Sequence, residues 1–392
     1  MKVALFSPIN PVRTGISDYT EEMLEAFRMH FEFDLYYDPN IKPSNKVIQK
    51  KFSLIPFEDQ AFDQNKYDVC IYHMGNFFEG HHYIYEALKK YPGIVVLHDY
   101  VLQGFYAERY AKTRNFDEYL ELEKQTYGKR GEEIAHQIAA QIPPPIWDTE
   151  SALEFPLNEE IIDHSLGLIV HSDFVKERIL EKSKKPIKRI PPHGYMQKTF
   201  DTKTAREKMG IGQDDILVCS AGFINKNKRF EIIFKAVSDL DDSRLKFVIA
   251  GKDRGGLITG LLEEYSFDVI RRDHLPLDEL EELICASDIC INLRYPTMGE
   301  SSGSLLRMMG YGKPTLVTNF GSYREFPDHC VLKIDPDIDE QEMVKRFLVA
   351  LLEDEDFRRS IGREAKIYID QECNIEKCAA EYARFISTLS KG

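Results

Sequence analysis

Short apolar runs alternate with longer stretches of helical period along the whole chain. In the first half, the runs that predict strands are 3–6, 33–37, 69–72, 94–97 and 168–170. In the second half, they are 216–219, 246–250, 268–270, 289–293, 315–318 and 331–334. Amphipathic segments such as 18–30 lie between these runs, so the pattern predicts an α/β protein with a parallel sheet in each half.

A charged segment over 115–142 also has helical period, and a run of prolines at 143–145 ends it. Further along the chain, a polar stretch separates the two series of predicted strands. We therefore expect a first domain over 1–195, a linker near 195–205 and a second domain over 196–369.

The composition limits the possible classes of function. The chain has 392 residues, a formal charge of −14 and a pI near 5.4. A nucleic-acid partner is not expected, because binding phosphates requires a basic surface. Seven cysteines without a CxxC pair indicate reduced thiols, and the start MKVALFSPIN is interpreted as a strand rather than a signal peptide. These features, with no membrane-spanning apolar run, predict a cytoplasmic location.

The stretch 299–319 predicts a loop, a short helix and a strand. The start of this stretch carries Glu300, Ser301, Ser302, Gly303 and Ser304. The free N–H groups and positive dipole end of such a helix suit a phosphate or a sugar hydroxyl. Serines that merely cap a helix give the same pattern, so both interpretations stay open.

Other unusual residues directly follow predicted strands, where an open parallel sheet binds its ligand. Gly15 lies in the first such turn and permits either close approach of a ligand or a tight turn. This turn lacks the GxGxxG pattern of dinucleotide sites. His98 with Asp99, and later His171, follow other strands and are candidates to contact a sugar hydroxyl or share a proton. Histidines that satisfy loop carbonyls are the alternative.

Two clusters of cations stand out in this acidic chain. Gly222 opens a turn that contains Lys226, Lys228 and Arg229, which predicts either an anion site or a solvated loop. The second cluster consists of Lys182, Lys184, Lys185, Lys188 and Arg189. It is compatible with contact to an anionic membrane surface, although an ordinary solvated loop is the commoner outcome for such a run.

Seven motifs occur in the order of a known family: PVRTGISDYTEEML, VVLHDY, IVHSDFVKERI, IPPHGY, SAGFINKNKRFEIIFKA, FVIAGK and LEELICASDICINL. Together they make the chain resemble the family 4 retaining glycosyltransferases, also described as glycosyl transferase group 1. The resemblance implies the GT-B fold, in which two Rossmann-like domains with parallel sheets face each other across an interdomain cleft. It also implies that a C-terminal helix over 370–392 crosses back to the first domain.

The resemblance further implies transfer of a sugar from a UDP-, GDP- or ADP-sugar to a glycan or lipid-linked acceptor, without a divalent metal. The implied catalytic residues are His98 at the donor sugar, Lys228 at the diphosphate, and Glu300. The residues expected to bind the donor are Gly15, Gly222, Lys228, Arg229, Ser301, Ser302, Gly303, Ser304 and Arg307. Those expected on the acceptor or sugar side are Tyr19, Asp99 and His171.

Two positions depart from the family pattern. Arg307 stands where the family commonly has a ribose-binding glutamate, and Phe223 stands where it has an arginine. We hypothesise that Arg307 replaces the lost diphosphate contact, because a guanidinium matches phosphate oxygens in two-point contact. An ion pair on its own helix is the alternative. Among functions, the alternatives are a GT-B protein that binds nucleotide or glycan without turnover, a sugar-nucleotide epimerase and a phosphorylase.

Overall fold

The computed structural model describes residues 1–194, 196, 198–253, 255–265, 267–337 and 339–389. The chain forms two compact units. The first consists of Met1–Pro192, Pro296–Ser301 and Ile375–Gly392, and the second of His193–Tyr295 and Ser302–Asn374. The expected linker includes positions 195 and 197, and the expected final helix includes 390–392. These positions lie outside the described residues.

The first unit is built on a seven-stranded sheet in which all the paired strands are parallel. The strand order is β3-β2-β1-β4-β5-β6-β7. The strands are β1 (Lys2–Phe6), β2 (Glu32–Tyr37), β3 (Ser53–Pro56), β4 (Val69–Met74), β5 (Gly93–Leu97), β6 (Ser165–Val170) and β7 (Ile187–Arg189). The order reverses between β1 and β4, so the switch point where such sheets bind ligands lies there.

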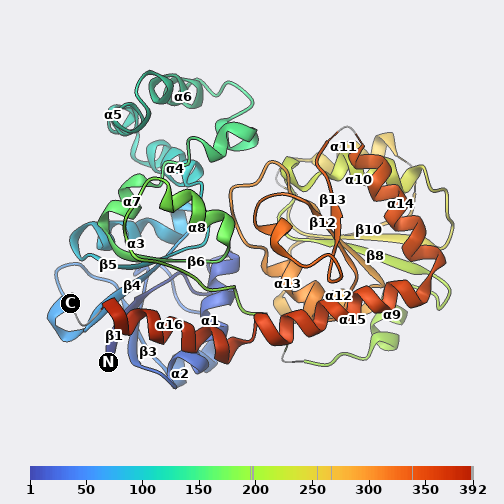
Figure 1. The fold of residues 1–392 in the computed structure, drawn as a ribbon, viewed down its shortest axis with the longest axis horizontal. Helices are drawn as coiled ribbons and strands as arrows, with labels where there is room; N and C mark the ends of the chain where they lie inside the picture. Colours follow the sequence, from blue (N-terminus) through green and yellow to red (C-terminus); the bar gives the residue numbers. More distant parts are fainter. Residues whose placement is uncertain (195, 197, 254, 266, 338, 390–392) are drawn as a thin grey trace. The chain divides into compact units, whose positions relative to one another are not determined.

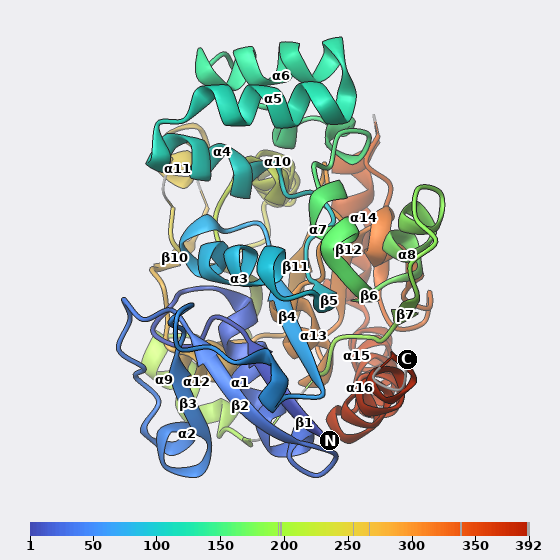
Figure 2. The same cartoon turned by 90° about the vertical axis from the view of Figure 1, so that its left-hand side faces the viewer.

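Helices cover both faces of this sheet (Figure 1). The α-helices are α1 (Gly15–Phe27), α2 (Lys46–Lys51), α3 (Phe78–Lys90), α4 (Gln103–Thr113), α5 (Phe116–Tyr127), α6 (Lys129–Ala139), α7 (Glu159–His164), α8 (Asp173–Leu180) and α16 (Ile375–Leu389). Short 3-10 helices are η1 (Gln64–Lys66), η2 (Ile146–Asp148) and η3 (Glu150–Leu153). The charged segment predicted over 115–142 forms the adjacent pair α5 and α6 (Figure 2), with Gly128 at a φ of +61° between them.

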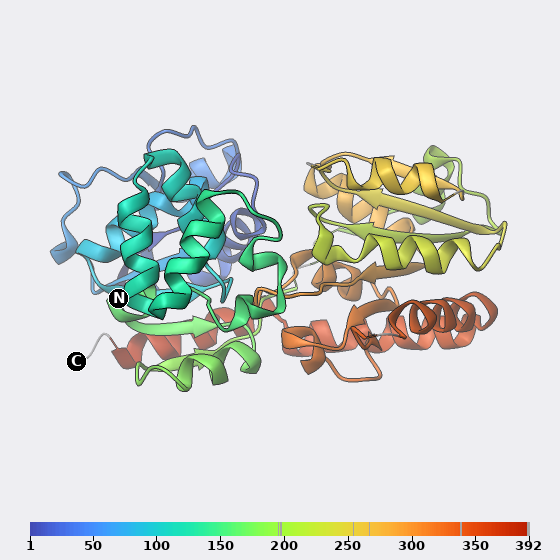
Figure 3. The same cartoon turned by 90° about the horizontal axis from the view of Figure 1, so that it is seen from above.

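The second unit repeats the same topology with six parallel strands in the order β10-β9-β8-β11-β12-β13. The strands are β8 (Ile216–Ala221), β9 (Leu245–Ala250), β10 (Val269–Arg272), β11 (Ile289–Asn292), β12 (Thr315–Thr318) and β13 (Leu332–Ile334). The switch point lies between β8 and β11. Seen from above, helices again lie on both sides of this sheet (Figure 3).

The α-helices of the second unit are α9 (Thr202–Met209), α10 (Phe230–Ser238), α11 (Leu257–Glu264), α12 (Leu277–Ala286), α13 (Gly303–Gly310), α14 (Glu340–Glu353) and α15 (Glu355–Glu372). Two 3-10 helices, η4 (Lys226–Lys228) and η5 (Gly321–Glu325), complete it. The central strands are buried almost throughout and form the cores with the apolar helix faces. The predicted α/β architecture with two parallel sheets is therefore confirmed.

Two strands, β3 and β7, do not stand out in the sequence. Both lie at the edges of the first sheet, and their residues are only half-buried or exposed, so they lack the continuous apolar run of the central strands. No described helix has both the length and the apolar character needed to cross a bilayer.

Candidate functional site

Helix α1 begins at the switch point of the first sheet. The Thr14 side chain accepts a hydrogen bond from the N–H of Ile16 at 3.2 Å and so caps the helix, and Gly15 is its first residue. Gly15 does not have a positive φ, and a Cβ added to it would meet no atom within 4 Å. The local backbone therefore does not require glycine there, which favours close approach of a ligand over the tight-turn interpretation.

Three histidines form a hydrogen-bonded chain across neighbouring strands of the first sheet. His73 Nδ1 lies 2.9 Å from His98 Nε2, and His98 Nδ1 lies 3.2 Å from His171 Nε2. His171 Nδ1 lies 2.9 Å from the carbonyl oxygen of Ile190. His73 belongs to β4, while His98 and His171 directly follow β5 and β6, so the sheet order itself brings them together.

The Ile190 carbonyl determines the tautomers of this chain. A carbonyl only accepts, so His171 carries its proton on Nδ1 and its neutral Nε2 accepts from His98. His98 is then protonated on Nδ1, and its Nε2 accepts from His73. Burial lowers the pKa of His73 to about 3 and that of His171 to about 4, so both rings are neutral near pH 7. Both nitrogens of His98 therefore take part in the chain.

Tyr19 packs on this chain from α1. Its ring centroid lies 5.0 Å from that of His98 in an edge-to-face arrangement and 5.5 Å from that of His171. Its hydroxyl lies 2.8 Å from that of Tyr382 in α16. Burial is the main cause that raises the pKa of Tyr19 well above its ordinary value, which keeps the phenol protonated. Tyr19 thus helps to hold His98 in place.

Asp99 organises the neighbouring loop. Its Oδ2 accepts a hydrogen bond from the N–H of Asn76 at 2.7 Å. The residue between β4 and Asn76 is Gly75, where a Cβ would lie 2.5 Å from Ile16 Cδ1 and 3.0 Å from Asp99 Oδ2. Asp99 and the glycine together allow the loop to pack closely against the start of α1.

The segment Pro296–Ser301, which the sequence assigns to the second domain, belongs to the first unit. The N–H of Tyr100 donates to the carbonyl of Met298 at 3.0 Å. Glu300 is buried, and its Oε2 accepts from Thr297 Oγ1 and from the N–H of Met298, both at 2.8 Å. The Glu300 carboxylate therefore shapes this loop, and its contact with a sugar stays a prediction.

In the second unit, the turn after β8 directs a buried lysine to the end of that strand. Lys228 is 2% exposed, and its Nζ donates to the carbonyl of Ala221 at 2.7 Å. Gly222 has a φ of +114°, a conformation that favours glycine, and a Cβ there would lie 3.0 Å from Lys228 Nζ. The lysine charge is therefore held at the carboxyl end of β8, beside the switch point.

A serine from α13 reaches the same carbonyl. Ser304 Oγ donates to the carbonyl of Ala221 at 3.3 Å and accepts from Asn292 Nδ2 at 3.1 Å. Ser302 caps the helix, and in the described part of the chain the N–H groups of Gly303 and Ser304 have no acceptor, as expected of a first turn. Two N–H groups and Lys228 thus lie at the ends of two adjacent strands, β8 and β11.

Arg294 is a functional candidate that the sequence interpretation missed. It follows β11 by two positions, and its Nη2 donates to Ser302 Oγ at 3.2 Å. Its own N–H donates to Thr318 Oγ1 at 2.9 Å, at the end of β12. The available signal was a cation directly after a strand, but the apolar run 289–293 drew attention to the strand alone.

Two of the expected donor-binding cations have carboxylate partners. Arg229 Nε donates to Glu340 Oε2 at 2.9 Å, and Arg307 Nη1 lies 2.6 Å from Glu281 Oε1. The second pair is buried, and the hydroxyl of Tyr311 donates to Glu281 Oε2 at 3.1 Å. Arg307 therefore has an ion-pair partner on the neighbouring helix α12, and its contact with a diphosphate stays a prediction.

Most of the basic run at 182–189 is engaged within the first unit. The ion pairs are Lys182 with Glu159 at 2.7 Å, Lys188 with Glu381 at 2.9 Å, and Arg189 with Asp173 at 3.9 Å. Lys185 donates to the carbonyls of Asp163 and Ser165. The prediction that this whole run is a solvated loop is partly wrong, because Lys188 and Arg189 lie in the edge strand β7.

Part of the chain matches a known family model. Residues 201–368 match the family model described as Glycosyl transferases group 1. No curated protein matches the chain.

Three solved structures have the same fold over nearly their whole length. Anabaena HepE in complex with UDP-glucose has a TM-score of 0.69 at 12% identity, over 99% of this chain and 100% of its own. Sucrose-phosphate synthase from Thermosynechococcus elongatus has a TM-score of 0.66 at 16% identity, over 99% of each chain. WaaG, a glycosyltransferase involved in lipopolysaccharide biosynthesis, has a TM-score of 0.61 at 17% identity, over 98% of this chain and 99% of its own.

Two units with the same Rossmann-like strand order define the GT-B fold. The match of residues 201–368 to the glycosyl transferases group 1 model, together with this fold, supports a glycosyltransferase. The resemblance noted from the sequence is confirmed for the GT-B fold and for glycosyl transferases group 1, whereas family 4 and the retaining mechanism stay predictions.

Proposed function

We propose that the chain is a retaining glycosyltransferase that transfers a sugar from a nucleotide diphosphate sugar to a glycan or lipid-linked acceptor without a divalent metal. The observation that carries the proposal is the shared carbonyl of Ala221, which accepts from both Lys228 Nζ and Ser304 Oγ. It fixes an ammonium group and the start of α13 side by side at the switch point of the second sheet.

This arrangement suits a departing diphosphate. When the acceptor hydroxyl bonds to the anomeric carbon, the bond from that carbon to the diphosphate oxygen breaks, and negative charge develops on the diphosphate. Lys228, Arg294 and the N–H groups of Gly303 and Ser304 supply positive charge and donors that are already in position. In the proposed reaction, the acceptor proton passes to the departing oxygen.

In the first unit, we assign Gly15 to the approach of the diphosphate and His98 to the donor sugar. Open space beside Gly15 supports the first role. For the second role, the neutral chain through His73 and His171 holds the His98 ring in one orientation and one tautomer. A hydrogen bond from His98 to the sugar then requires one of its nitrogens to exchange a histidine partner for a sugar hydroxyl. Tyr19, Asp99 and His171 form the acceptor side of this proposal, together with the loop that Glu300 shapes.

Metal independence follows from assigning the neutralising charge to Lys228 and Arg294. Under this proposal, a chelator leaves the rate unchanged, whereas loss of activity that manganese restores would contradict it.

The nature of the acceptor is proposed from one structural relative. WaaG is described as a glycosyltransferase of lipopolysaccharide biosynthesis, so we propose polysaccharide biosynthesis at the cytoplasmic side of a membrane. In the basic run, Lys184 is exposed and is the residue best suited to contact anionic lipid. Sedimentation with anionic liposomes at low and high salt tests this contact.

Incubation with UDP-, GDP- and ADP-sugars, including UDP-glucose because HepE is solved with it, tests the function. The expected result is release of one nucleoside diphosphate that increases when an acceptor is added, with the product anomer retained by NMR. Binding without release would favour a silent GT-B protein. Sugar isomerisation, or phosphate-dependent release of sugar phosphate, would favour an epimerase or a phosphorylase.

A further inference from the structure

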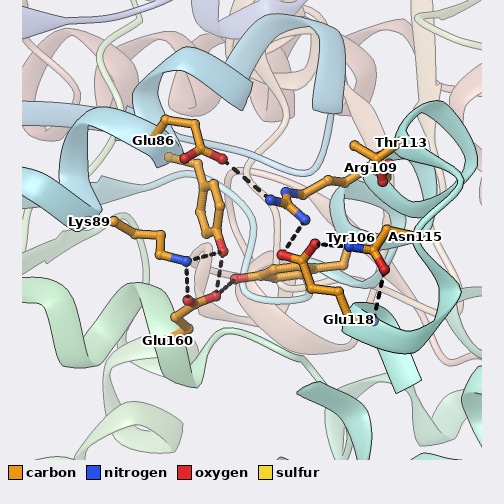
Figure 4. A network of polar contacts seen from close by, with 9 residues as sticks. Glu86, Lys89, Tyr106, Arg109, Thr113, Asn115, Glu118 and Glu160 are labelled. Atoms are coloured by element: carbon orange, nitrogen blue, oxygen red, sulfur yellow. Dashed lines mark hydrogen bonds and ion pairs between the residues drawn. The ribbon is translucent and has the colours of Figure 1, made fainter. Parts of the chain in front are cut away.

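A cavity of about 260 Å³ lies among helices that the proposed reaction does not use. It is lined by residues of α3, α4, α5 and α7 (Figure 4). Helices α4, α5 and α6 belong to the long connection between β5 and β6, which is far larger than a single crossover helix requires. The cavity volume is close to the lower end of small-molecule sites, about 300 Å³.

Tyrosine rings form the apolar part of the cavity. Tyr110 and Tyr119 stack with centroids 5.7 Å apart and planes 5° apart. Tyr119 directs its hydroxyl to buried Gln103 and Glu123. The hydroxyl of the half-buried Tyr110, by contrast, has no hydrogen bond in the described part of the chain. Tyr110 therefore offers a ring and a hydroxyl to a ligand.

The polar lining is preorganised by its own hydrogen bonds. Glu160 Oε2 accepts from the hydroxyls of Tyr85 at 2.7 Å and Tyr106 at 3.1 Å, and its Oε1 lies 3.1 Å from Lys89 Nζ. These contacts hold the carboxylate in one orientation. Oε2 already accepts from two hydroxyls, whereas Oε1 retains a further lone pair for a ligand hydroxyl.

The opposite wall carries a second fixed pair. Arg109 Nη1 lies 2.7 Å from Glu118 Oε1, and Asn115 Nδ2 donates to Glu118 Oε2 at 2.9 Å. Arg109 is 19% exposed, so this pair meets both cavity and solvent.

The charges of the lining disfavour an anion. Two cations, Lys89 and Arg109, face three carboxylates, those of Glu118, Glu121 and Glu160, and both cations are paired with carboxylates. A phosphate or uronate would therefore meet an excess of negative charge. A neutral ring with several hydroxyls matches both parts of the lining, since its C–H faces stack on tyrosine and its hydroxyls bond to carboxylate and guanidinium.

We propose that this cavity binds one residue of a neutral saccharide, as a site separate from the donor-binding residues. If the proposed transferase function holds, the saccharide is part of the acceptor glycan, and the cavity selects acceptors by a sugar remote from the reacting hydroxyl. The identification as acceptor, but not the binding itself, rests on that function.

The test measures binding of neutral trisaccharides, maltotriose and cellotriose, and of a trigalacturonate, to the full chain by calorimetry and saturation-transfer NMR without nucleotide sugar. We expect a neutral trisaccharide to bind and the trigalacturonate not to bind. Tyr110→Ala should weaken binding about tenfold and Tyr110→Phe much less, because stacking contributes most. Glu118→Gln should also weaken binding.

The matched control is Glu133→Gln, since Glu133 forms an exposed ion pair with Arg130 at 3.0 Å on α6, outside the cavity. It should leave binding unchanged. Thermal unfolding of each variant checks the fold. The affinity for whichever of UDP, GDP and ADP the wild type binds, measured separately, should be equal in all variants. Absence of neutral saccharide binding, equal binding of the uronate, or wild-type affinity in both Tyr110→Ala and Glu118→Gln would overturn the proposal. If UDP, GDP and ADP all fail to bind while saccharide binding is intact, the result would instead contradict the transferase function alone.

Discussion

His98 Nδ1 lies 3.2 Å from His171 Nε2, and the Ile190 carbonyl at the end of this chain determines which nitrogen of each ring carries a proton. The three rings come from β4 and from the ends of β5 and β6, which are neighbours in the sheet. One backbone carbonyl beyond β7 thus controls the orientation of a proposed catalytic ring two strands away.

His171→Phe tests this relationship. The change keeps an aromatic ring but removes the acceptor of His98 Nδ1–H, so the protonation of His98 should shift toward Nε2. Side-chain ¹⁵N NMR should show this tautomer change, and transfer should slow about tenfold or more. His136→Gln on α6 alters an exposed histidine and is the control. An unchanged His98 tautomer in His171→Phe would contradict the chain.

Lys228→Ala should weaken nucleoside diphosphate binding and slow transfer by roughly a hundredfold, the scale of one preorganised charge contact. Lys226→Ala is the matched control, because Lys226 lies in the same short η4 helix but is exposed. Calorimetry with the nucleotide and an initial-rate assay measure the two effects. A Lys228→Ala variant within threefold of wild type would refute the assigned role.

Arg307→Ala should destabilise the second unit, because it leaves the Glu281 carboxylate buried without its ion-pair partner. The expected loss is about 3–5 kcal/mol in the free energy of unfolding, measured by urea denaturation. Arg307→Met combined with Glu281→Gln should recover most of it, since the amide oxygen still accepts from Tyr311.

The same double variant decides whether Arg307 also binds the diphosphate. Stability is then largely restored, so a nucleotide affinity at least tenfold below wild type would support the contact. Wild-type affinity would show that Arg307 is a structural partner of Glu281 and nothing more.

Glu123→Gln should stabilise the first unit at pH 8 more than at pH 5. Burial raises the pKa of Glu123 from 4.5 to about 7. Between pH 4.5 and pH 7, the folded state therefore keeps the carboxyl proton that the unfolded state has already released. Stability contributed by this group is therefore present below pH 4.5 and lost as the pH rises through 7. The difference is on the order of 3 kcal/mol by linkage. Denaturant unfolding at both pH values measures it, and a pH-independent effect would contradict the raised pKa.

The sequence predicted the central strands of both sheets because each is a continuous apolar run between amphipathic helices. A strand that is buried on both faces has such a run, since all its side chains lie in the core. The edge strands β3 and β7 escaped the same reasoning, since a half-exposed strand needs no such run. Likewise, Lys228 could be selected from a basic turn after a strand, although that turn did not indicate that Lys228 is buried while Lys226 is exposed.

The order of apolar runs and the residues after them thus determined the α/β class, the two-unit organisation and most candidate residues, because these depend on local periodicity and on the ends of strands. Tertiary structure alone decided which of those residues meet. The three histidines lie far apart in the chain and are joined only by the strand order, and Arg307 is paired because α12 presents Glu281 to it. Pairing partners and burial depend on elements distant in sequence, so no local pattern of residues encodes them.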